Sequence, residues 1–220
     1  MNQRINMDLL SRCEPLDDDT VDIFLRTYCG LEQHETIAYI NSIQMECALH
    51  AHRNARNDAV KKLGPLFRNK AAAMEGMVVL VHGPKAGNPI VNDVNQNNHG
   101  SILYYSRLKN IFYHYDSHDN FNYPKVWEII SFFLHYEIVR KEGIRCFVPD
   151  FIPQQPGNWE CSYFCIAFAY ILGIKRISYP IGSQDIVTWS SNELFDMRLG
   201  SIFRNHLFSY ATEYEHAFGR

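Results

Sequence analysis

The chain has 220 residues, 46% of them hydrophobic and 20% charged, which is typical of a globular protein and predicts a single domain over residues 1–220. The formal net charge is −3 and the 21 basic residues are scattered, so we expect no nucleic-acid partner. No apolar run of about 18 residues occurs, so we also expect no membrane span.

The N-terminal residues and the cysteines indicate the compartment. MNQRINMDLLSRCEP is polar and lacks the apolar stretch of a cleaved secretion signal. The six cysteines include no CxxC pair, which suits reduced thiols. We therefore expect a cytoplasmic or nuclear protein or, if the source is a bacterium, a secreted effector that acts in a host cell.

The first third of the chain is predicted to contain two helices and a loop. LDDDTVDIFLRTY (16–28) begins with acidic residues and continues with apolar residues at helical spacing, so Asp17 or Asp18 can cap a helix there. A second helix is expected over about 34–54. A loop is expected over 61–76, which contains a Gly-Pro pair.

Strands dominate the next part. Three short runs of β-forming residues, separated by turns rich in Gly, Pro and Asn, predict strands over 77–82, 101–107 and 111–117. A helix over 124–143, with Pro near its start and Gly at its end, is followed by a strand over 145–151.

The last part returns to helices. CSYFCIAFAYILG (161–173) is apolar nearly all round, which predicts a buried helix closed by Gly173. A further helical stretch over 191–218 contains Gly200 as a candidate interruption. The succession of helices, strands and helices indicates an α+β fold.

The two strands around HGSILYYSRLKNIFYHYDSH predict a hairpin with a functional consequence. A loop of two or four residues places Ser101 opposite Asp116 and Tyr105 opposite Phe112. His99 then shares a face with Asp116 and lies diagonal to it, close enough for the side chains to meet. A carboxylate beside an imidazole fixes its tautomer, as a Cys–His nucleophilic system requires, whereas a three-residue loop would break this parity.

Cys161 lies where a helix would stabilise a thiolate. The N–H groups and dipole at a helix N-terminus lower a thiol pKa, and a neighbouring His lowers it further. Gln155, six residues upstream, can direct its amide toward the same point. Together with the N–H of Cys161 it would form a two-donor oxyanion hole.

Each feature also has a simpler structural explanation. A cysteine at the start of an apolar helix is most often a small buried hydrophobe, and core filling is the expected role of Cys165, although a disulfide to Cys161 on oxidation is an alternative. His114, Asp116 and His118 share a strand face and offer metal-binding groups, but no HExxH-like pair supports a metal. We expect neither a metal nor a cofactor.

Taken together, these segments resemble the ubiquitin-like-protein proteases, a clan of deSUMOylases, deneddylases, the adenovirus protease and bacterial effectors. Their pattern runs His-Trp-Ser-Leu, a hairpin ending in Tyr-Asp-Ser, and Gln before Asp-Cys-Gly. Residues 99–118 and PQQPGNWECSYF (153–164) follow that order, and 16–28 resembles the family's Leu-Asn-Asp helix. The resemblance covers 16–173 and implies a papain-like-clan architecture, with a central mixed or antiparallel sheet flanked by helices and the nucleophile at the N-terminus of a buried helix.

The resemblance implies a role for each matched residue. It makes Cys161 the nucleophile, His99 the base and then the acid, Asp116 the residue that orients His99, and Gln155 the oxyanion donor. The implied reaction is thiol attack on the carbonyl of a C-terminal glycine, followed by hydrolysis of the thioester.

The resemblance also implies the substrate-binding residues. The start of the Leu-Asn-Asp-like helix frames the substrate channel in the family, which implies contacts from Asp17 and Asp18. We expect further contacts from Gly100, Trp159 and Ser162. The implied partner is ubiquitin or a ubiquitin-like modifier with its conjugates, bound by a monomer.

Four positions depart from the family pattern. Gly100 and Pro15 replace two tryptophans that roof the channel, so we expect a channel that is wider or is closed by another segment. Ser162 replaces a glycine, and its hydroxymethyl group either crowds the oxyanion pocket or faces the helix side. Glu160 replaces an aspartate with the same charge.

Two other functions remain open. The same thiol chemistry would serve an effector acetyltransferase or a protease of non-modifier proteins, although no basic cluster for inositol phosphate is visible. The second alternative is a catalytically silent modifier-binding module, and the presence of Cys161 and His99 argues against it.

Overall fold

In the computed structural model, the described residues are 5–12, 14–64, 74–84, 98–148, 152, 154, 155, 157, 159–178 and 199–218. The chain divides into two compact units. Unit 1 comprises Met1–Gln33 and Asp150–Arg220, and unit 2 comprises His34–Pro149. Each unit is described in turn.

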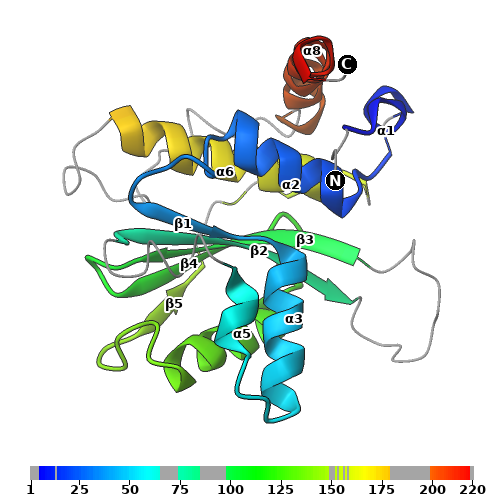
Figure 1. The fold of residues 1–220 in the computed structure, drawn as a ribbon. Helices are drawn as coiled ribbons and strands as arrows, with labels where there is room; N and C mark the ends of the chain where they lie inside the picture. Colours follow the sequence, from blue (N-terminus) through cyan, green and yellow to red (C-terminus); the bar gives the residue numbers. More distant parts are fainter. Residues whose placement is uncertain are drawn as a thin grey trace. The chain divides into compact units, whose positions relative to one another are not determined.

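Unit 2 is built on a five-stranded mixed sheet with the strand order β1-β2-β3-β4-β5 (Figure 1). Its strands are β1 (Ile37–Ile40), β2 (Gly76–Pro84), β3 (Asn98–Ser106), β4 (Ile111–Tyr115) and β5 (Arg145–Phe147). The outer pairs, β1–β2 and β4–β5, are parallel, whereas β2–β3 and β3–β4 are antiparallel. The predicted α+β class and mixed sheet are confirmed.

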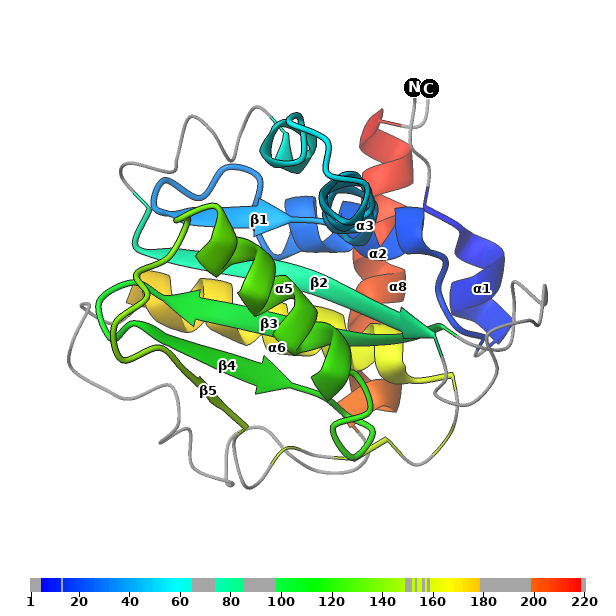
Figure 2. The same ribbon diagram turned by 90° about the horizontal axis from the view of Figure 1, so that it is seen from below.

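Two helices connect the parallel pairs, because parallel neighbours need a crossover connection. Helix α3 (Ser42–Arg53) lies between β1 and β2 in sequence, and α5 (Tyr123–His135) lies between β4 and β5. Both helices cover the same face of the sheet (Figure 2). A short 3-10 turn, η2 (Val60–Leu63), follows α3.

The core of unit 2 lies between that sheet face and the two helices. Helix α5 buries apolar side chains at intervals of three and four residues, which is the pattern of an amphipathic helix; they include Val126, Ile129, Ile130 and Phe133. Phe133 stacks on Phe112 of β4 with ring centroids 6.2 Å apart. Full burial of each such side chain stabilises the fold by about 1.5–3 kcal/mol.

The helix expected over 34–54 is wrong in its first part. Ile37–Ile40 form β1, because these residues pair in parallel with β2. Asn41 then starts α3 with a capping box, in which its side chain accepts from the N–H of Gln44 and the Gln44 side chain accepts from the N–H of Asn41.

The helix expected over 124–143 ends early, at His135. The chain reverses immediately afterwards, and Glu137 has a left-handed backbone with φ 55°. Gly143, expected to end the helix, lies instead in the turn before β5 with φ 69°. Of the strand expected over 145–151, β5 forms the first part, and 149–151 lie outside the described residues.

Unit 1 is helical in its described residues. Its elements are α1 (Met7–Arg12), α2 (Asp18–Ile23), the π-helical turn η1 (Phe24–Tyr28), α6 (Cys161–Ser178) and α8 (Leu199–Phe218). The helix expected over 16–28 is therefore present, with its second half wound as a π-helix. Ring contacts link η1 to both long helices: Tyr28 stacks on Tyr170 at 4.9 Å and meets Tyr210 at 4.9 Å.

The two glycines that were expected to end or interrupt helices in this unit lie inside helices instead. Helix α6 continues through Gly173 to Ser178, and Gly200 lies in the first turn of α8. A glycine inside a helix costs about 1 kcal/mol, an amount that packing of a long helix readily offsets. The beginning of the predicted stretch 191–218 lies outside the described residues.

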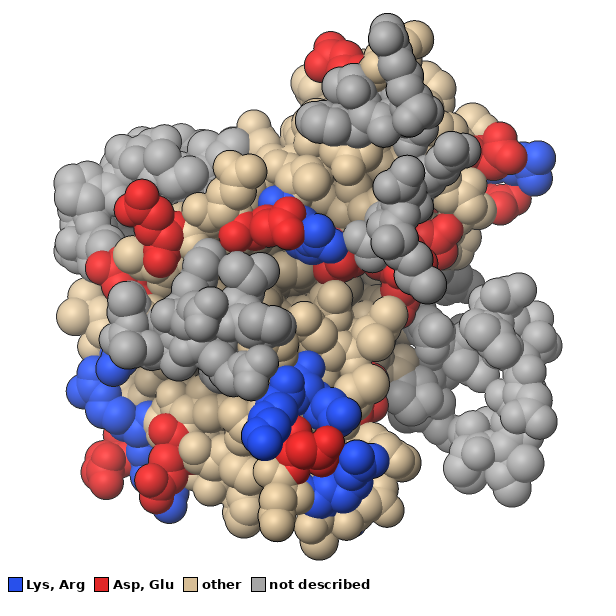
Figure 3. Space-filling view, viewed as in Figure 1, with Lys and Arg blue, Asp and Glu red and all other residues tan. Residues whose placement is uncertain are grey.

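On the face drawn in Figure 3, acidic and basic side chains lie beside one another in several places. Arg26 pairs with Glu32 at 2.8 Å and Lys62 with Asp58 at 3.2 Å. Exposed pairs of this kind contribute about 0–1 kcal/mol each. None of the helices in the part of the chain that the structure describes combines the length and the apolar character that a bilayer crossing needs.

The capping box of α3 gives a stability prediction. Asn41→Ala removes the acceptor for the Gln44 N–H and is expected to lower the free energy of unfolding by about 1 kcal/mol, as measured by urea denaturation. Asn57→Ala, in an exposed turn, serves as the control and is expected to change stability by less than about 0.5 kcal/mol. Equal effects of the two substitutions would contradict the capping role.

Candidate active site

The β3–β4 hairpin has the predicted register. Tyr105 lies opposite Phe112, and the paired residues continue to Ile102 opposite Tyr115. The connecting turn is the four-residue Arg107–Asn110, whose last residue has a left-handed backbone with φ 54°. This even-numbered turn keeps His99 and Asp116 on one face of the sheet.

His99 and Asp116 form a buried pair. The Nε2 atom of His99 lies 2.5 Å from Oδ1 of Asp116, and the two residues are 6% and 1% exposed. A carboxylate at Nε2 fixes that nitrogen as the N–H donor. Any proton that His99 exchanges with a nucleophile or a leaving group must therefore pass through Nδ1.

Two backbone N–H groups also donate to Asp116. Oδ1 accepts from His118 at 2.9 Å and Oδ2 accepts from Asn122 at 2.9 Å. Burial by itself would raise the pKa of Asp116, but the hydrogen bond and charge of His99 and the Asn122 N–H outweigh it, so the pKa of this carboxyl is lowered. Asp116 is thus held as a carboxylate.

A second imidazole lies behind the pair. His114 is fully buried, with Nε2 3.0 Å from the Ser101 hydroxyl and 3.7 Å from Oδ2 of Asp116. Burial lowers the pKa of His114 to about 4, because desolvation outweighs the attraction of Asp116. His114 is therefore neutral near pH 7.

Two rings lie against the imidazole of His99. His118 meets it at 5.5 Å and Phe121 at 5.6 Å, both edge-to-face. They come from the turn after β4, in which Asp119 and Asn120 have left-handed backbones. Gly100, which stands where the family pattern has a tryptophan, is buried in β3 opposite His82 of β2. Aromatic groups near His99 thus come from a different segment than the pattern predicts.

Cys161 is the first residue of α6 and is 5% exposed. The first turn closes through the Phe164 N–H, which donates to the carbonyl of Glu160 at 3.1 Å. The predicted position of the nucleophile candidate at the start of a buried helix is confirmed. A thiolate formed there would lie at the positive end of the helix dipole.

Two other thiols are poor nucleophile candidates. Burial raises the pKa of Cys146 to about 12 and raises the pKa of Cys29 well above its usual value, so both remain protonated near pH 7. Cys165 is buried and forms no disulfide, in agreement with core filling.

The loop before Cys161 is folded on itself by polar contacts. The amide nitrogen of Gln155 donates to the Gly157 carbonyl at 2.6 Å, and the Gly157 N–H donates to the buried carboxylate of Glu160 at 2.8 Å. Trp159 is half-buried and packs edge-to-face on Tyr163, with ring centroids 5.5 Å apart.

The start of α2 is tied to the start of α6. Asp17 caps α2 by accepting from the Thr20 N–H at 2.7 Å, and Asp18 is the first helical residue. The Ser162 hydroxyl donates to the carbonyl of Leu16 at 3.4 Å. The Ser162 hydroxymethyl group therefore points toward Leu16, which is the helix-side orientation of the two that were expected.

The structure therefore brings the predicted site residues together in two groups. His99, Asp116 and Gly100 lie in unit 2, and the cysteine, its loop and the α2 cap lie in unit 1. The sequence placed Ser101 and His114 near Asp116 but did not predict the hydrogen-bond network that these two residues form with Asn122 and Asp116. The signal available was the polar run that follows β4, DSHDNFN, which is rich in residues able to form side-chain-to-backbone bonds.

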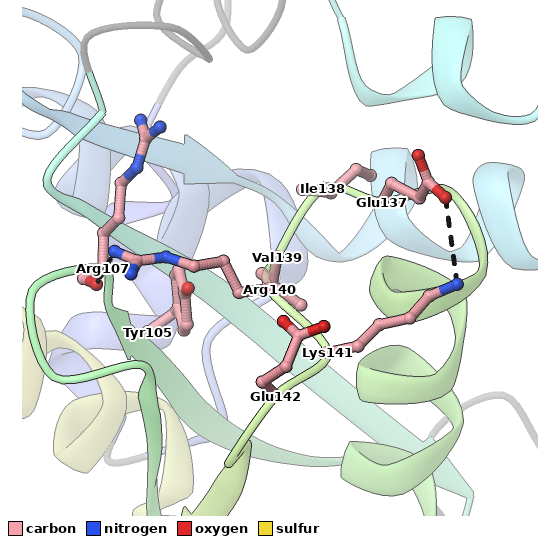
Figure 4. Close-up of a pocket in the computed structure, with 8 residues that line it drawn as sticks. All are labelled: Tyr105, Arg107, Glu137, Ile138, Val139, Arg140, Lys141 and Glu142. Atoms are coloured by element: carbon pink, nitrogen blue, oxygen red, sulfur yellow. Dashed lines mark hydrogen bonds and ion pairs between the residues drawn. The ribbon is translucent and has the colours of Figure 1, made fainter.

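A hollow of about 320 Å³ lies at the opposite end of β3 from His99 and is lined by none of the predicted site residues (Figure 4). Its charged groups are engaged locally: Lys141 pairs with Glu137 at 3.8 Å, and Arg140 donates to the carbonyl of Arg107 at 3.2 Å. Among the described residues, no group of three or more His, Cys, Asp or Glu side chains is placed to hold a metal ion.

No family model and no curated protein matches the sequence. Solved structures do match it. The Ulp1 protease domain in complex with Smt3, the yeast orthologue of SUMO, has a TM-score of 0.62 at 12% identity, covering 94% of this chain and 81% of that chain. The catalytic domain of a Ulp1-like SUMO protease from Chaetomium thermophilum has a TM-score of 0.56 at 14% identity, covering 93% and 75%.

This chain has the fold of the Ulp1 SUMO proteases. The central domain of an uncharacterized Legionella pneumophila protein shares the same fold, with a TM-score of 0.51 at 14% identity, covering 90% of this chain and 99% of that chain. The expected papain-like-clan architecture is thereby confirmed. In the Ulp1-like fold of this chain, His99 lies in β3, Asp116 directly follows β4, and α6 begins at Cys161.

The neutral state of His114 gives a pH prediction for the Ulp1-like fold. Its pKa falls from 6.5 to about 4 on folding, so between these pH values the unfolded chain binds the extra proton. Acidification through this window is expected to lower the free energy of unfolding by on the order of 3 kcal/mol through this residue.

Urea denaturation at several pH values measures the effect by comparison with His114→Gln. The wild-type stability should fall more steeply below pH 6.5 than that of the variant. His216→Gln, at an exposed position of α8, is the control and should retain the wild-type slope. Parallel curves for wild type and His114→Gln would show that His114 is not buried in its neutral form.

Proposed function

We propose that the chain is a thiol protease that cleaves after the C-terminal glycine of a ubiquitin-like modifier. The observation that carries this proposal is the His99–Asp116 pair, because a buried carboxylate at Nε2 prepares Nδ1 for proton transfer. The start of α6 at Cys161 and the Ulp1-like fold support the same assignment.

In the first half of the reaction, His99 takes the proton of the Cys161 thiol, and the resulting thiolate attacks the carbonyl carbon of the terminal glycine. The new S–C bond moves the carbonyl electron pair onto oxygen, where the Gln155 amide and the Cys161 N–H stabilise the charge. The C–N bond then breaks, and the amine leaves with a proton from the imidazolium of His99.

In the second half, His99 takes a proton from water as the water attacks the thioester. The C–S bond breaks, the thiolate of Cys161 is regenerated and the modifier leaves with a free carboxylate. Asp116 stabilises the imidazolium in both halves, because its carboxylate is held by His99 and by two backbone N–H groups.

The proposed substrate is ubiquitin, SUMO or a Nedd-type modifier attached to another protein. SUMO is the first candidate, since one matched structure is a complex with the yeast SUMO orthologue. We propose that the modifier tail runs past Gly100 and Trp159 and near the α2 start at Asp17 and Asp18. Ser162 donates to Leu16, so its proposed contribution is to hold this start in place.

A panel of modifiers with electrophilic C-termini tests the proposal. At least one modifier is expected to label Cys161 covalently, and Cys161→Ala is expected to abolish the adduct in intact-mass spectra. His99→Ala should slow labelling by roughly 10²–10⁴-fold, because the general base is lost.

Cys165→Ala is the matched control, since it removes another thiol of the same helix and should keep the adduct. A chain that no modifier labels, although a small thiol reagent reacts readily with Cys161, would overturn the modifier specificity. That outcome would favour a protease or acyltransferase with another substrate. A chain in which modifiers bind but Cys161 reacts with neither reagent would be a silent binding module.

A further inference from the structure

Asn122 departs from the usual behaviour of an asparagine at the start of a helix. It occupies the N-cap position of α5, where an Asn side chain ordinarily accepts from the N–H groups of the first turn. Its side chain makes no such cap bond and is 1% exposed. The residue therefore forgoes a capping interaction and directs a buried amide elsewhere.

The amide and the backbone of Asn122 contact both members of the His99–Asp116 pair. Its Nδ2 donates to the carbonyl of His99 at 2.9 Å and to the hydroxyl of Ser101 at 2.9 Å, with a longer contact of 3.5 Å to the carbonyl of Val81. Its backbone N–H donates to Oδ2 of Asp116 at 2.9 Å. One residue thus holds the strand at His99 and the carboxylate at Asp116.

The orientation of the amide follows from its surroundings. The three atoms on one side are acceptors, two of them carbonyl oxygens, so Nδ2 must face them and Oδ1 must face away. Oδ1 is buried and accepts no hydrogen bond from the described residues. The fold tolerates this buried acceptor, although an unsatisfied polar atom is unfavourable, because the other side of the amide makes the contacts.

Gly83 supplies the space for this arrangement. It lies directly opposite His99 in the β2–β3 pairing. A Cβ at position 83 would lie 2.3 Å from Oδ1 of Asn122, far inside van der Waals contact. The Asn122 side chain therefore fills the volume that a side chain at position 83 would occupy.

We propose that Asn122 is a positioning residue that fixes the distance and angle between His99 and Asp116, and that Gly83 is required for it. This inference rests on the proposed function, in which that pair activates Cys161. We call these Asn122 contacts the clamp: the His99 backbone, in β3, and the Asp116 carboxylate, directly after β4, are bonded to the same residue. Loss of the amide frees His99 to move relative to Asp116.

A mutant cycle distinguishes this role from general packing. Asn122→Ala removes the amide, and Gly83→Ala pushes it out while leaving Asn122 in the sequence. Each substitution is expected to lower kcat by about 100-fold with little change in KM, because misplacement of a catalytic group by about 1 Å has that effect. The reaction measured is hydrolysis of a C-terminal amide of the modifier that labels Cys161. The double variant should match Asn122→Ala, since the new Cβ then meets empty space.

A second readout does not depend on any modifier. Proton NMR of the folded chain should show a downfield Nε2–H signal for His99, which the short contact to Asp116 produces. The signal should broaden or shift in Asn122→Ala and in Gly83→Ala. Asn54→Ala is the matched control, because it removes a side-chain amide that donates to the His50 carbonyl at the end of α3 and should leave kcat and the signal unchanged.

The outcomes separate the two proposals. Wild-type kcat and an unchanged His99 signal in folded Asn122→Ala or Gly83→Ala would overturn the positioning role, whatever the substrate is. Additive losses in the double variant would overturn the link between Gly83 and Asn122. Failure of every modifier to react with the wild type, while the His99 signal responds as expected, would overturn the proposed function and leave the clamp supported.

Discussion

A buried carboxylate needs hydrogen-bond donors, and this requirement at Asp116 determines the arrangement of the candidate site. Its two oxygens accept from the His99 imidazole and from the N–H groups of His118 and Asn122. The last two donors come from the turn that follows β4, so the carboxylate that orients His99 also folds this turn. The same segment places the rings of Phe121 and His118 against the His99 ring. Orientation of the imidazole and the shape of its surroundings thus depend on one charged group.

The mixed sheet explains why these groups meet. The antiparallel β3–β4 pair brings His99 and Asp116 to the same end of the sheet, and β2 places Gly83 beside them. The parallel outer strands need helical crossovers, and the second crossover helix, α5, begins at the residue that contacts both His99 and Asp116. The polar cluster is therefore anchored to elements whose own positions are fixed by a large apolar core. Groups held on strands and helix ends in this way keep a geometry that loops alone hold less well.

Much of this arrangement could be predicted from the sequence, for a definite reason. Side chains alternate along a strand, so the parity of the Arg107–Asn110 turn alone decided whether His99 and Asp116 share a face. Strand β1 could not be predicted in the same way, because four residues carry little signal and their state depends on pairing with β2. The role of Asn122 was equally hidden, since it depends on the folded turn and on the missing Cβ at Gly83. Local propensity identifies an asparagine before a helix as a cap, and here the buried acceptors of β2 and β3 outweigh that preference.

The proposed function requires that the His99–Asp116 pair activates the thiol of Cys161. The most direct test is the rate of Cys161 alkylation by iodoacetamide as a function of pH, followed by mass spectrometry of the Cys161 peptide so that other thiols do not contribute. If the pair activates this thiol, the alkylation profile moves to higher pH in His99→Ala and, by a smaller amount, in Asp116→Asn. A profile that is unchanged in both variants would contradict it.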